Sequence, residues 1–378
     1  VYGMLNNEKF MSKAPEAKIA EEKEKLAKYE SMMAKVQEQL KALEKYDISI
    51  LSILEQKEKP FFEIPDGIKK TRLDLGTKWI APGPSYLPLV PRLHRFLKNN
   101  QIDLLIDVDV ILDLLSVPAS AGLKTKIIAW EHFNYHYIWP SKMYQKFRHA
   151  AQWFSARNAD FIITLTRQDQ KNYENKLGRR NAIQTIHNPI MPVKQSENAL
   201  TREKSIITAG RLTWVKGIDL LEKLIPMILK KYPDWKWYVL GEGEERPRLE
   251  AVQKKYQLEN QLILTGNVSN VSAYMQKSSI YVMTSRSEGL PMVLLEAAQN
   301  GLPMVSFDIQ TGPSEIIEDG KNGFLIPPFS INDMIKKVEY LITHEEVRGT
   351  FSKNTSSIQK RFDADLITAQ WERMIDRL

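Results

Sequence analysis

Cysteine and long uncharged apolar runs are both absent from this chain of 378 residues. Without cysteine there is no disulfide framework, no thiolate metal site and no cysteine nucleophile, a composition that suits a reducing cytosol. The longest apolar stretch, IDLLIDVDVILDLLSVPASAG, is interrupted by Asp and falls short of the roughly 20 uncharged residues of a membrane span. A basic patch followed by an apolar core is also missing at the start, so no signal peptide is expected.

Several catalytic signatures are missing too. The sequence holds no G-x-x-x-x-G-K-[ST] loop, no H-E-x-x-H and no G-x-S-x-G. P-loop, zincin and hydrolase-elbow chemistry therefore lose support. Side chains at metal-ligand spacing are absent as well, so we expect a site without metal or other cofactor.

What the chain does contain is a modest excess of positive charge and enough apolar residues for two full cores. The formal net charge is +7, and 43% of the residues are apolar. The charge favours an anionic partner, which leaves a membrane surface, a phosphorylated substrate and nucleic acid open. A mixed surface with some extra lysine explains the same number equally well.

Residues 1–45 are expected to form a helical segment. Apolar residues recur every seven positions at Ile19, Leu26, Met33 and Leu40 within a stretch rich in Lys, Glu and Ala. This heptad spacing predicts a helix that pairs with a partner helix. A single solvated helix accounts for the pattern equally well.

Two later regions alternate short β-branched or apolar runs with helical periods. The expected strands are 47–54, 68–75, 103–109, 125–131, 160–166 and 182–187 in the first region, and 205–209, 235–240, 261–265, 279–284, 303–307 and 323–326 in the second. Expected helices in the first region are 84–99, 141–158 and 167–177. Such alternation predicts α/β architecture with two doubly wound parallel sheets facing across a cleft. The expected domains are 46–190 and 191–360, with a helical end over 361–378.

Glu288 and Glu296 stand out in SRSEGLPMVLLEAAQNG. Glu288 closes a turn after an apolar strand, and Glu296 lies two turns into the following amphipathic helix. A strand-to-helix turn leaves backbone N–H groups unpaired, which suits a phosphate. Two carboxylates beside it can accept hydrogen bonds from hydroxyl groups.

A second turn of this kind occurs in TAGRLTWVKG. Gly210 permits a sharp turn, while Arg211 and Lys216 offer two cations that suit a diphosphate. Gly241 and Gly243 follow the next strand and permit a tight turn with close approach of a ligand. Each cation taken alone is more often an ordinary surface residue.

Two further groups of residues lie at the ends of predicted strands. Glu131 and His132 close a strand in WEHFNYH and are expected to face the cleft, although a lone histidine is usually structural. Gly312, followed by Pro313, and Glu315 end another strand. An ordinary loop and helix cap explains that second group as well as a binding role does.

Together these residues resemble the retaining nucleotide-sugar glycosyltransferases of family 4, which have the GT-B fold. The resemblance covers about residues 46–378 and rests on GR at 210–211 with KG at 216–217, SEGLPMVLLEA, TGPSEII, EH at 131–132, and TLT at 164–166 followed by NP at 188–189. It implies a hexosyltransferase.

The resemblance also implies residue roles. Arg211 and Lys216 would bind the donor diphosphate and stabilise the leaving charge. Glu296 would accept hydrogen bonds from the ribose, Glu288 would hold the sugar hydroxyls, and His132 would lie near the transferring sugar. Donor binding would also involve Gly210, Gly241, Gly289, Leu290 and Gly312, the backbone N–H groups of Gly289 and Leu290 cradling phosphate.

The start of the chain departs from that family, whose members begin with a strand and a Gly-rich turn. Residues 5–43 instead resemble the C-terminal coiled-coil arm of a valyl-tRNA synthetase, on NEKFMSKAPEA and the helix after it. A natural fusion, a rearranged gene and an artefact all fit, and each would leave a central strand to be replaced.

The resemblance thus implies transfer of a sugar from a nucleotide-sugar, with UDP favoured, to a lipid-linked saccharide in capsule or exopolysaccharide biosynthesis. The protein is expected in the cytoplasm, docked on the anionic inner face of the cell membrane. Self-association through residues 1–45 is expected, and nucleic acid is not. The alternative is a catalytically impaired GT-B protein whose N-terminal coiled coil mediates association with protein or RNA.

Overall fold

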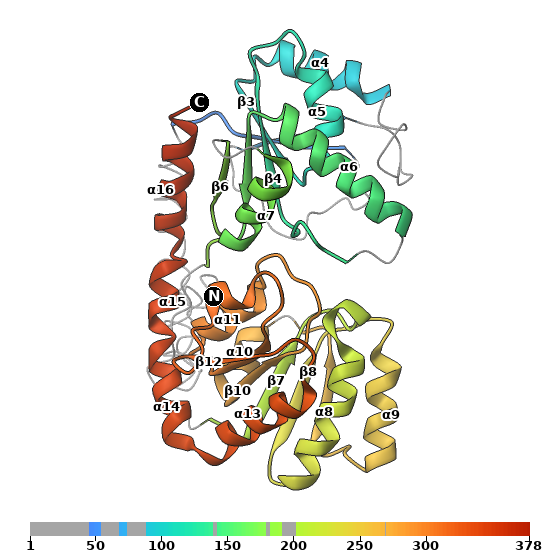
Figure 1. Ribbon diagram of the computed structural model, residues 1–378, viewed down its shortest axis with the longest axis vertical. Helices are drawn as coiled ribbons and strands as arrows, with labels where there is room; N and C mark the ends of the chain where they lie inside the picture. Colours follow the sequence, from blue (N-terminus) through green and yellow to red (C-terminus); the bar gives the residue numbers. More distant parts are fainter. Residues whose placement is uncertain are drawn as a thin grey trace, which may run out of the picture. The chain divides into compact units, whose positions relative to one another are not determined.

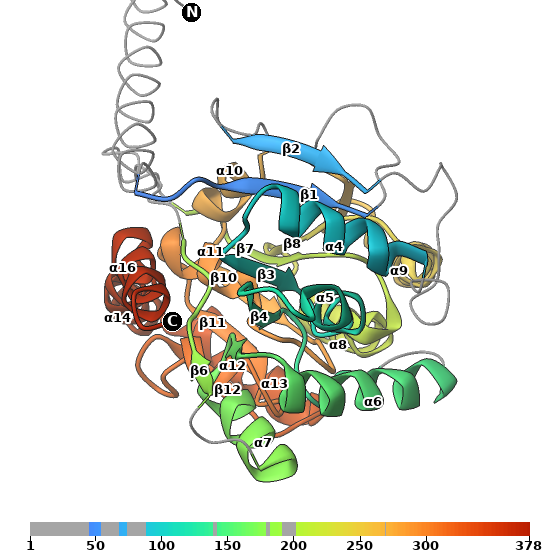
Figure 2. The same ribbon diagram turned by 90° about the horizontal axis from the view of Figure 1, so that it is seen from above.

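The computed structural model describes residues 45–53, 68–73, 88–138, 142–178, 182–190, 202–268 and 270–378 (Figure 1). The heptads expected before residue 45 lie outside this range. The chain divides into two compact units, residues 1–80 and 81–378. In the first, β1 (Ser49–Ser52) pairs in parallel with β2 (Lys69–Arg72), as Figure 2 shows. The domain boundaries expected at residues 45, 190 and 360 stay predictions.

The second unit contains a four-stranded parallel sheet in the order β3-β4-β5-β6. Its strands are β3 (Leu104–Val108), β4 (Lys126–Glu131), β5 (Phe161–Thr164) and β6 (Ile183–Thr185). Its helices are α4 (Val90–Asn99), α5 (Asp113–Ser120), α6 (Lys142–Asn158) and α7 (Arg167–Leu177). The helix expected over 84–99 is observed over Val90–Asn99; residues 88–89 before it form a 3-10 turn, and residues 84–87 lie outside the described range.

The second unit also contains a six-stranded parallel sheet in the order β12-β11-β10-β7-β8-β9. Its strands are β7 (Ser205–Ala209), β8 (Lys236–Leu240), β9 (Leu262–Gly266), β10 (Ile280–Met283), β11 (Met304–Phe307) and β12 (Gly323–Ile326). The helices here are α8 (Ile218–Lys231), α9 (Arg246–Tyr256), α10 (Val271–Lys277), α11 (Met292–Gln299), α12 (Pro313–Ile316) and α13 (Ile331–Thr343), with a short 3-10 turn, η2 (Trp214–Lys216). Every strand range expected from the sequence overlaps an observed strand.

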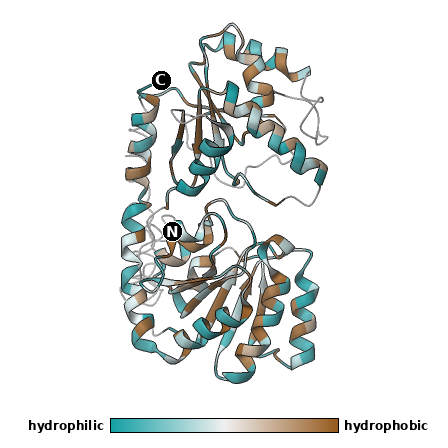
Figure 3. Ribbon diagram, viewed as in Figure 1, coloured by the Kyte–Doolittle hydropathy of each residue, from teal (hydrophilic) through white to brown (hydrophobic). Residues whose placement is uncertain are grey.

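The six-stranded sheet has an apolar layer on each face. The larger core joins the sheet to α8, α9 and α13 through residues such as Leu224, Trp237, Phe307 and Val338. The other core includes Tyr281, Leu294 and Leu302. Figure 3 shows apolar residues concentrated along the strands, as burial on both faces requires.

The last residues of the chain form three separate helices, where a helical end was expected over 361–378. They are α14 (Glu345–Asn354), α15 (Ser356–Arg361) and α16 (Ala364–Ile375). Asp363 starts the last one, because its Oδ1 accepts the backbone N–H of Asp365 at 3.0 Å. Ile367 and Met374 then pack with Ile128, Ile163 and Ile186 of the four-stranded sheet or its edge (Figure 1). The end of the chain thus covers one face of that sheet.

Candidate functional site

The order of the six-stranded sheet marks where a ligand is expected. From β7 the chain adds β8 and β9 on one side, and then returns to add β10, β11 and β12 on the other. The switch point therefore lies between β7 and β10, and doubly wound sheets bind ligands beyond the carboxyl ends of such strands. The loops that leave those two ends are 210–217 and 284–291, which carry most of the residues expected from the sequence.

Glycines let these loops touch at backbone distance. Gly217 has φ +72°, and a Cβ there would lie 2.0 Å from the carbonyl oxygen of Thr284. Gly241 has φ +127°, and a Cβ would lie 2.0 Å from the carbonyl oxygen of Gly210. Thr284 Oγ1 also donates to the carbonyl oxygen of Lys216 at 3.0 Å. Only glycine fits at 217 and 241 without moving the loop that holds Lys216.

Arg286 holds the 210–217 loop in place, a role that the sequence did not reveal. Its guanidinium donates to both carboxylate oxygens of Asp219 at 2.7 Å and lies 4.4 Å from the ring centre of Trp214. Its backbone N–H donates to the carbonyl oxygen of Val215 at 2.8 Å. Burial raises the pKa of Asp219, but the bonds from Arg286 outweigh it and leave the pKa below its usual value. We infer that Arg286 orders this turn.

Lys216 and Glu288, expected on separate grounds, are direct partners. Lys216 Nζ lies 2.6 Å from Glu288 Oε1. The Glu288 side chain is 10% exposed and that of Lys216 is 32% exposed, so a ligand can reach both from solvent. Arg211 is exposed on the same loop as Lys216. A cation from one strand end and a carboxylate from the next thus meet at the switch point.

Glu296 lies on α11, and both it and Glu288 are near the hydroxyl group of Tyr281 on β10. Burial raises the pKa of Glu296, and no hydrogen bond to its carboxylate occurs among the residues that the structure describes. The buried Tyr281 hydroxyl donates to the carbonyl oxygen of Ala209 at 3.2 Å. Burial raises the Tyr281 pKa, and the charges of Glu296 and Glu288 raise it further. The negative charges of both carboxylates therefore raise the pKa of the same Tyr281 hydroxyl group.

The turn between Glu288 and α11 is closely packed. A Cβ on Gly289 would lie 2.5 Å from the carbonyl oxygen of His132. Gly312, with φ +102°, brings its Cα near the same turn, since a Cβ there would lie 2.7 Å from the carbonyl oxygen of Gly289. Leu290 points into the core and is buried. Any role of Gly289 and Leu290 toward a ligand thus falls to their backbone.

Asn134 joins the loop after β4 to the loop after β10. Its Nδ2 donates to the carbonyl oxygen of Glu288 at 2.6 Å and to Ser287 Oγ at 3.2 Å. Thr311 Oγ1 donates to the same Glu288 carbonyl at 2.7 Å. Asn134 in WEHFNYH and Thr311 in TGPSEII had no expected role, because their partners are distant along the chain.

His132 is half-buried beside this contact. Burial lowers its pKa, although the charge of Asp109 acts in the opposite direction, so the imidazole is neutral near pH 7. Its ring centre lies 4.4 Å from that of Trp130. Its Nε2 is buried and has no hydrogen-bond partner in the described part of the chain.

Glu131 does not face a cleft, contrary to the expectation from the sequence. The side chain is fully buried: Oε1 accepts from Arg148 Nη2 at 2.5 Å and from the backbone N–H of Phe133 at 2.9 Å, and Oε2 accepts from the Tyr173 hydroxyl at 2.6 Å. His132 follows the end of β4 and is half-buried, so the two neighbouring side chains have different surroundings. Glu131 is therefore a structural residue that fixes the strand end.

Arg148 extends this buried polar cluster to Asp109, with two bonds at 2.9 and 3.0 Å. Asp109 has φ +122°, a conformation rare for a residue with a Cβ. Burial raises the pKa of Asp107 to about 6 and that of Asp169 to about 7. The buried Arg148 guanidinium thus bonds the carboxylates of Asp109 and Glu131, which lie at the ends of β3 and β4.

Glu315 serves as a helix cap. Its Oε1 accepts the backbone N–H of Arg167, the first residue of α7, at 2.6 Å, and its Oε2 lies 3.9 Å from His187 Nε2. Both contacts bind the α12 turn to the end of the four-stranded sheet. Glu315 thus caps α7 and not its own short helix, whose start has no side-chain cap, and it makes no hydrogen bond or ion pair with Lys216 or Glu288.

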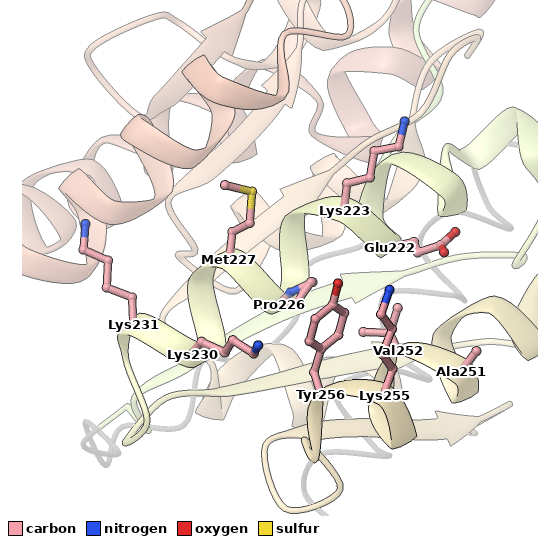
Figure 4. Close-up of a pocket in the computed structure, with 10 residues that line it drawn as sticks. All are labelled: Glu222, Lys223, Pro226, Met227, Lys230, Lys231, Ala251, Val252, Lys255 and Tyr256. Carbon is pink, nitrogen blue, oxygen red and sulfur yellow. The ribbon is translucent and has the colours of Figure 1, made fainter.

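A separate groove of about 700 Å³ lies between α8 and α9 (Figure 4). Its lining includes four lysines, at positions 223, 230, 231 and 255, with Met227 and Tyr256. Lys230 Nζ lies 4.4 Å from the ring centre of Tyr256. None of the expected site residues lines this groove, so it is distinct from the switch point.

Three sequence families match parts of this chain. The family described as Glycosyl transferases group 1 matches residues 192–357, and Glycosyltransferase Family 4 matches residues 38–193. The valyl tRNA synthetase tRNA binding arm matches residues 1–44.

Three known proteins are similar over most of both chains. An uncharacterised glycosyltransferase of Haemophilus influenzae is 30% identical, over 87% of this chain and 91% of its own. An α-1,4-N-acetyl-D-galactosaminyltransferase of Campylobacter jejuni, named for a PP-undecaprenol-linked saccharide, is 26% identical over 75% of this chain and 77% of its own. The crystal structure of Anabaena HepE in complex with UDP has a TM-score of 0.70 at 19% identity, covering 82% and 87% of the two chains. The last likeness shows the fold, which is GT-B.

Proposed function

Because this chain belongs to the group 1, family 4-like glycosyltransferases, we propose that it transfers a hexose from a UDP-sugar to a lipid-linked saccharide with retention of configuration. The product would enter a surface polysaccharide. The observation that carries this proposal is the Lys216–Glu288 pair, 2.6 Å apart at the switch point of the six-stranded sheet. The pair offers a cation that can bind the donor diphosphate and a carboxylate that can accept hydrogen bonds from sugar hydroxyls.

The donor diphosphate would lie against Arg211 and Lys216. On binding, Lys216 exchanges its contact with the Glu288 carboxylate for one with phosphate oxygens, and the exposed Arg211 adds a bidentate contact. Two cations on one ordered loop can stabilise the leaving diphosphate without a metal ion. The glycines at 217 and 241 keep that loop in place.

The two carboxylates would divide the hydroxyl groups of the donor between them. Glu296, half-buried on α11, would accept hydrogen bonds from the ribose. Glu288, released from Lys216, would accept hydrogen bonds from the sugar. Asn134 and Thr311 support this step, because both hold the backbone carbonyl of Glu288.

Transfer would proceed on one face of the sugar. The bond between the anomeric carbon and the phosphate oxygen breaks, and the acceptor oxygen bonds to the same face of that carbon. The acceptor proton passes to the leaving phosphate, whose charge Arg211 and Lys216 offset. A neutral His132 can accept or donate a hydrogen bond at the sugar, which its lowered pKa favours.

UDP as the nucleotide and a lipid as the acceptor carrier are proposed from two similar proteins. Anabaena HepE, which shares the fold, was crystallised with UDP. The Campylobacter jejuni relative is named for an acceptor on PP-undecaprenol. The net positive charge of +7 suits work beside an anionic membrane.

Release of nucleotide from a panel of UDP-, GDP- and ADP-sugars tests this function. The wild-type chain should release UDP slowly by hydrolysis and faster with a lipid-linked oligosaccharide. Lys216→Ala and Glu296→Ala should each lower the rate at least about tenfold, the effect of losing a hydrogen bond to a charged group. Lys230→Ala, in the groove between α8 and α9, is the matched control and should retain the rate.

No release with any donor, or equal rates in all four proteins, would refute the enzyme proposal. The anomeric configuration of the product, read by NMR, tests retention separately. A product inverted relative to the donor would refute the same-face step and leave the donor site standing.

A further inference from the structure

The helix α6 carries cations but no acidic residue. Its sequence, KMYQKFRHAAQWFSARN, holds Lys142, Lys146, Arg148 and Arg157. Arg148 points inward to the buried carboxylates, which leaves three cations for the outer part of the helix. The charge of this outer part is uniformly positive.

One face of α6 is buried and the opposite face exposes large apolar side chains. The buried face is Arg148, Ala151, Gln152, Ser155 and Ala156. On the outer face Met143 is 80% exposed and Trp153 is 51% exposed. Figures 1 and 2 show α6 running along the outside of the four-stranded sheet. A tryptophan and a methionine exposed on one helix face offer a contact surface when they belong to one stripe.

The exposed residues form a single stripe. Met143, Lys146, Ala150, Trp153 and Arg157 are spaced three or four residues apart, and all five are exposed. The Arg157 guanidinium lies 3.8 Å from the ring centre of Trp153, so cation and aromatic ring are presented together. Tryptophan and methionine flanked by lysine and arginine are typical of helices that lie in a membrane interface.

We propose that this face of α6, Lys142, Met143, Lys146, Ala150, Trp153 and Arg157, docks the protein on an anionic lipid bilayer. The apolar side chains enter the headgroup region, while the cations contact lipid phosphates. Contact of this kind needs no spanning segment. No helix in the described part of the chain is long and apolar enough to cross a membrane.

The position of α6 along the chain suits this task. Lys142 lies eight positions after Asn134, which touches the Glu288 loop, and an extended chain of eight steps spans at most about 28 Å. A membrane contact at α6 is therefore connected closely to the catalytic loop. The inference rests on the proposed function, since a lipid-linked acceptor gives the contact its purpose, but vesicle binding is measured without turnover.

The groove between α8 and α9 supplies a matched comparison. Met227 is 53% exposed there and lies beside Lys223 and Lys230. The lysines of the groove differ from those of α6 in their partners: Lys230 lies over Tyr256 and Lys231 bonds Glu339 at 2.7 Å. No tryptophan lines this groove. It therefore tests whether any exposed methionine beside lysines would bind lipid.

Co-sedimentation of the full chain with vesicles tests the proposal, using phosphatidylcholine alone and phosphatidylcholine with one-third phosphatidylglycerol. Wild type should bind only the anionic vesicles, and less at high salt. Trp153→Ala should weaken binding about tenfold through lost apolar burial. Lys146→Glu should weaken it at least about fivefold. Met227→Ala and Lys230→Glu should bind as wild type does.

Three results would overturn the proposal: no wild-type binding to anionic vesicles, unchanged binding of both α6 variants, or a change in oligomeric state of Trp153→Ala with vesicle binding intact. The last would make the stripe a contact between copies. Hydrolysis of UDP-sugar in solution tests the proposed function separately from vesicle binding. Trp153→Ala should retain the hydrolysis rate of wild type. An inactive wild type would refute the donor site, and the vesicle experiment would still test the docking surface.

Discussion

Glu296 is a half-buried carboxylate to which no hydrogen bond is made among the described residues, and burial raises its pKa. Because the pKa is raised, Glu296 protonates at a higher pH than an ordinary glutamate. Its charge, and with it the affinity for UDP, should fall as pH decreases through that raised pKa. Glu296→Gln should bind UDP at least about tenfold more weakly at neutral pH.

Calorimetric titration of UDP at several pH values checks this prediction. The glutamine variant should lose the acid-side decrease as well as the affinity. An equal pH slope in both proteins would show that another group titrates.

Asp169 should make stability depend on pH. Burial raises its pKa to about 7 in the folded protein, so its contribution to stability is full below its ordinary pKa and is lost as pH rises through about 7. The free energy of unfolding should therefore fall by up to about 3 kcal/mol between pH 5 and pH 8. Asp169→Asn should flatten this decrease, because asparagine can still accept the Tyr135 N–H at Oδ1.

Denaturant unfolding at pH 5, 6, 7 and 8 measures the effect. Asp234→Asn is the control, since Asp234 pairs with Lys204 on the surface. If wild type and Asp169→Asn show parallel curves, the buried carboxyl is not the group that titrates.

At the scale of elements, the loop between β7 and α8 depends on backbone contact. Gly217 and Gly178 both have φ +72°, but a Cβ on Gly217 would meet the Thr284 carbonyl at 2.0 Å, whereas Gly178 has nothing within 4 Å. Gly178→Ala should cost about 1 kcal/mol of stability, the penalty of the left-handed conformation. Gly217→Ala should cost more and also weaken UDP binding, because Lys216 must move with the loop.

Thermal unfolding and UDP titration of the two variants separate these effects. Equal losses of stability with intact UDP binding in Gly217→Ala would mean that the loop contact does not position Lys216.

The sequence predicted regular elements well where local signals were complete. The helix expected over 167–177 is α7 itself, because Thr166 caps its start and Gly178 ends it. The helix α5 was not anticipated, since Pro118 interrupts its pattern. The helical end expected over 361–378 contains α16, whose start Asp363 caps.

The candidate site was predictable only in part. Lys216 and Glu288 could be found from strand-end position and charge, and the fold brings them together. Asn134 and Arg286 could not, because each acts through partners that are adjacent only in three dimensions. Glu131 was misplaced because sequence alone does not tell which face of a strand is covered by Arg148 and Tyr173.

At the scale of the whole molecule, α16 returns to the four-stranded sheet. Ile367 is buried there against Ile128 and Ile163, whereas its neighbour Leu366 is 43% exposed. Ile367→Ala should lower the free energy of unfolding by about 2–4 kcal/mol. Leu366→Ala should change it by less than about 0.5 kcal/mol. Denaturant unfolding that ranks the two variants equally would show that α16 is not part of the folded core.

The central claim is that Lys216 and Glu288 form the diphosphate and sugar end of a UDP-sugar site. Titration of UDP into wild type, Lys216→Ala and Lys230→Ala, followed by calorimetry, tests it most directly. We predict binding by wild type and Lys230→Ala, and at least about tenfold weaker binding by Lys216→Ala. Absence of UDP binding by wild type, or equal affinity in all three proteins, would contradict the claim.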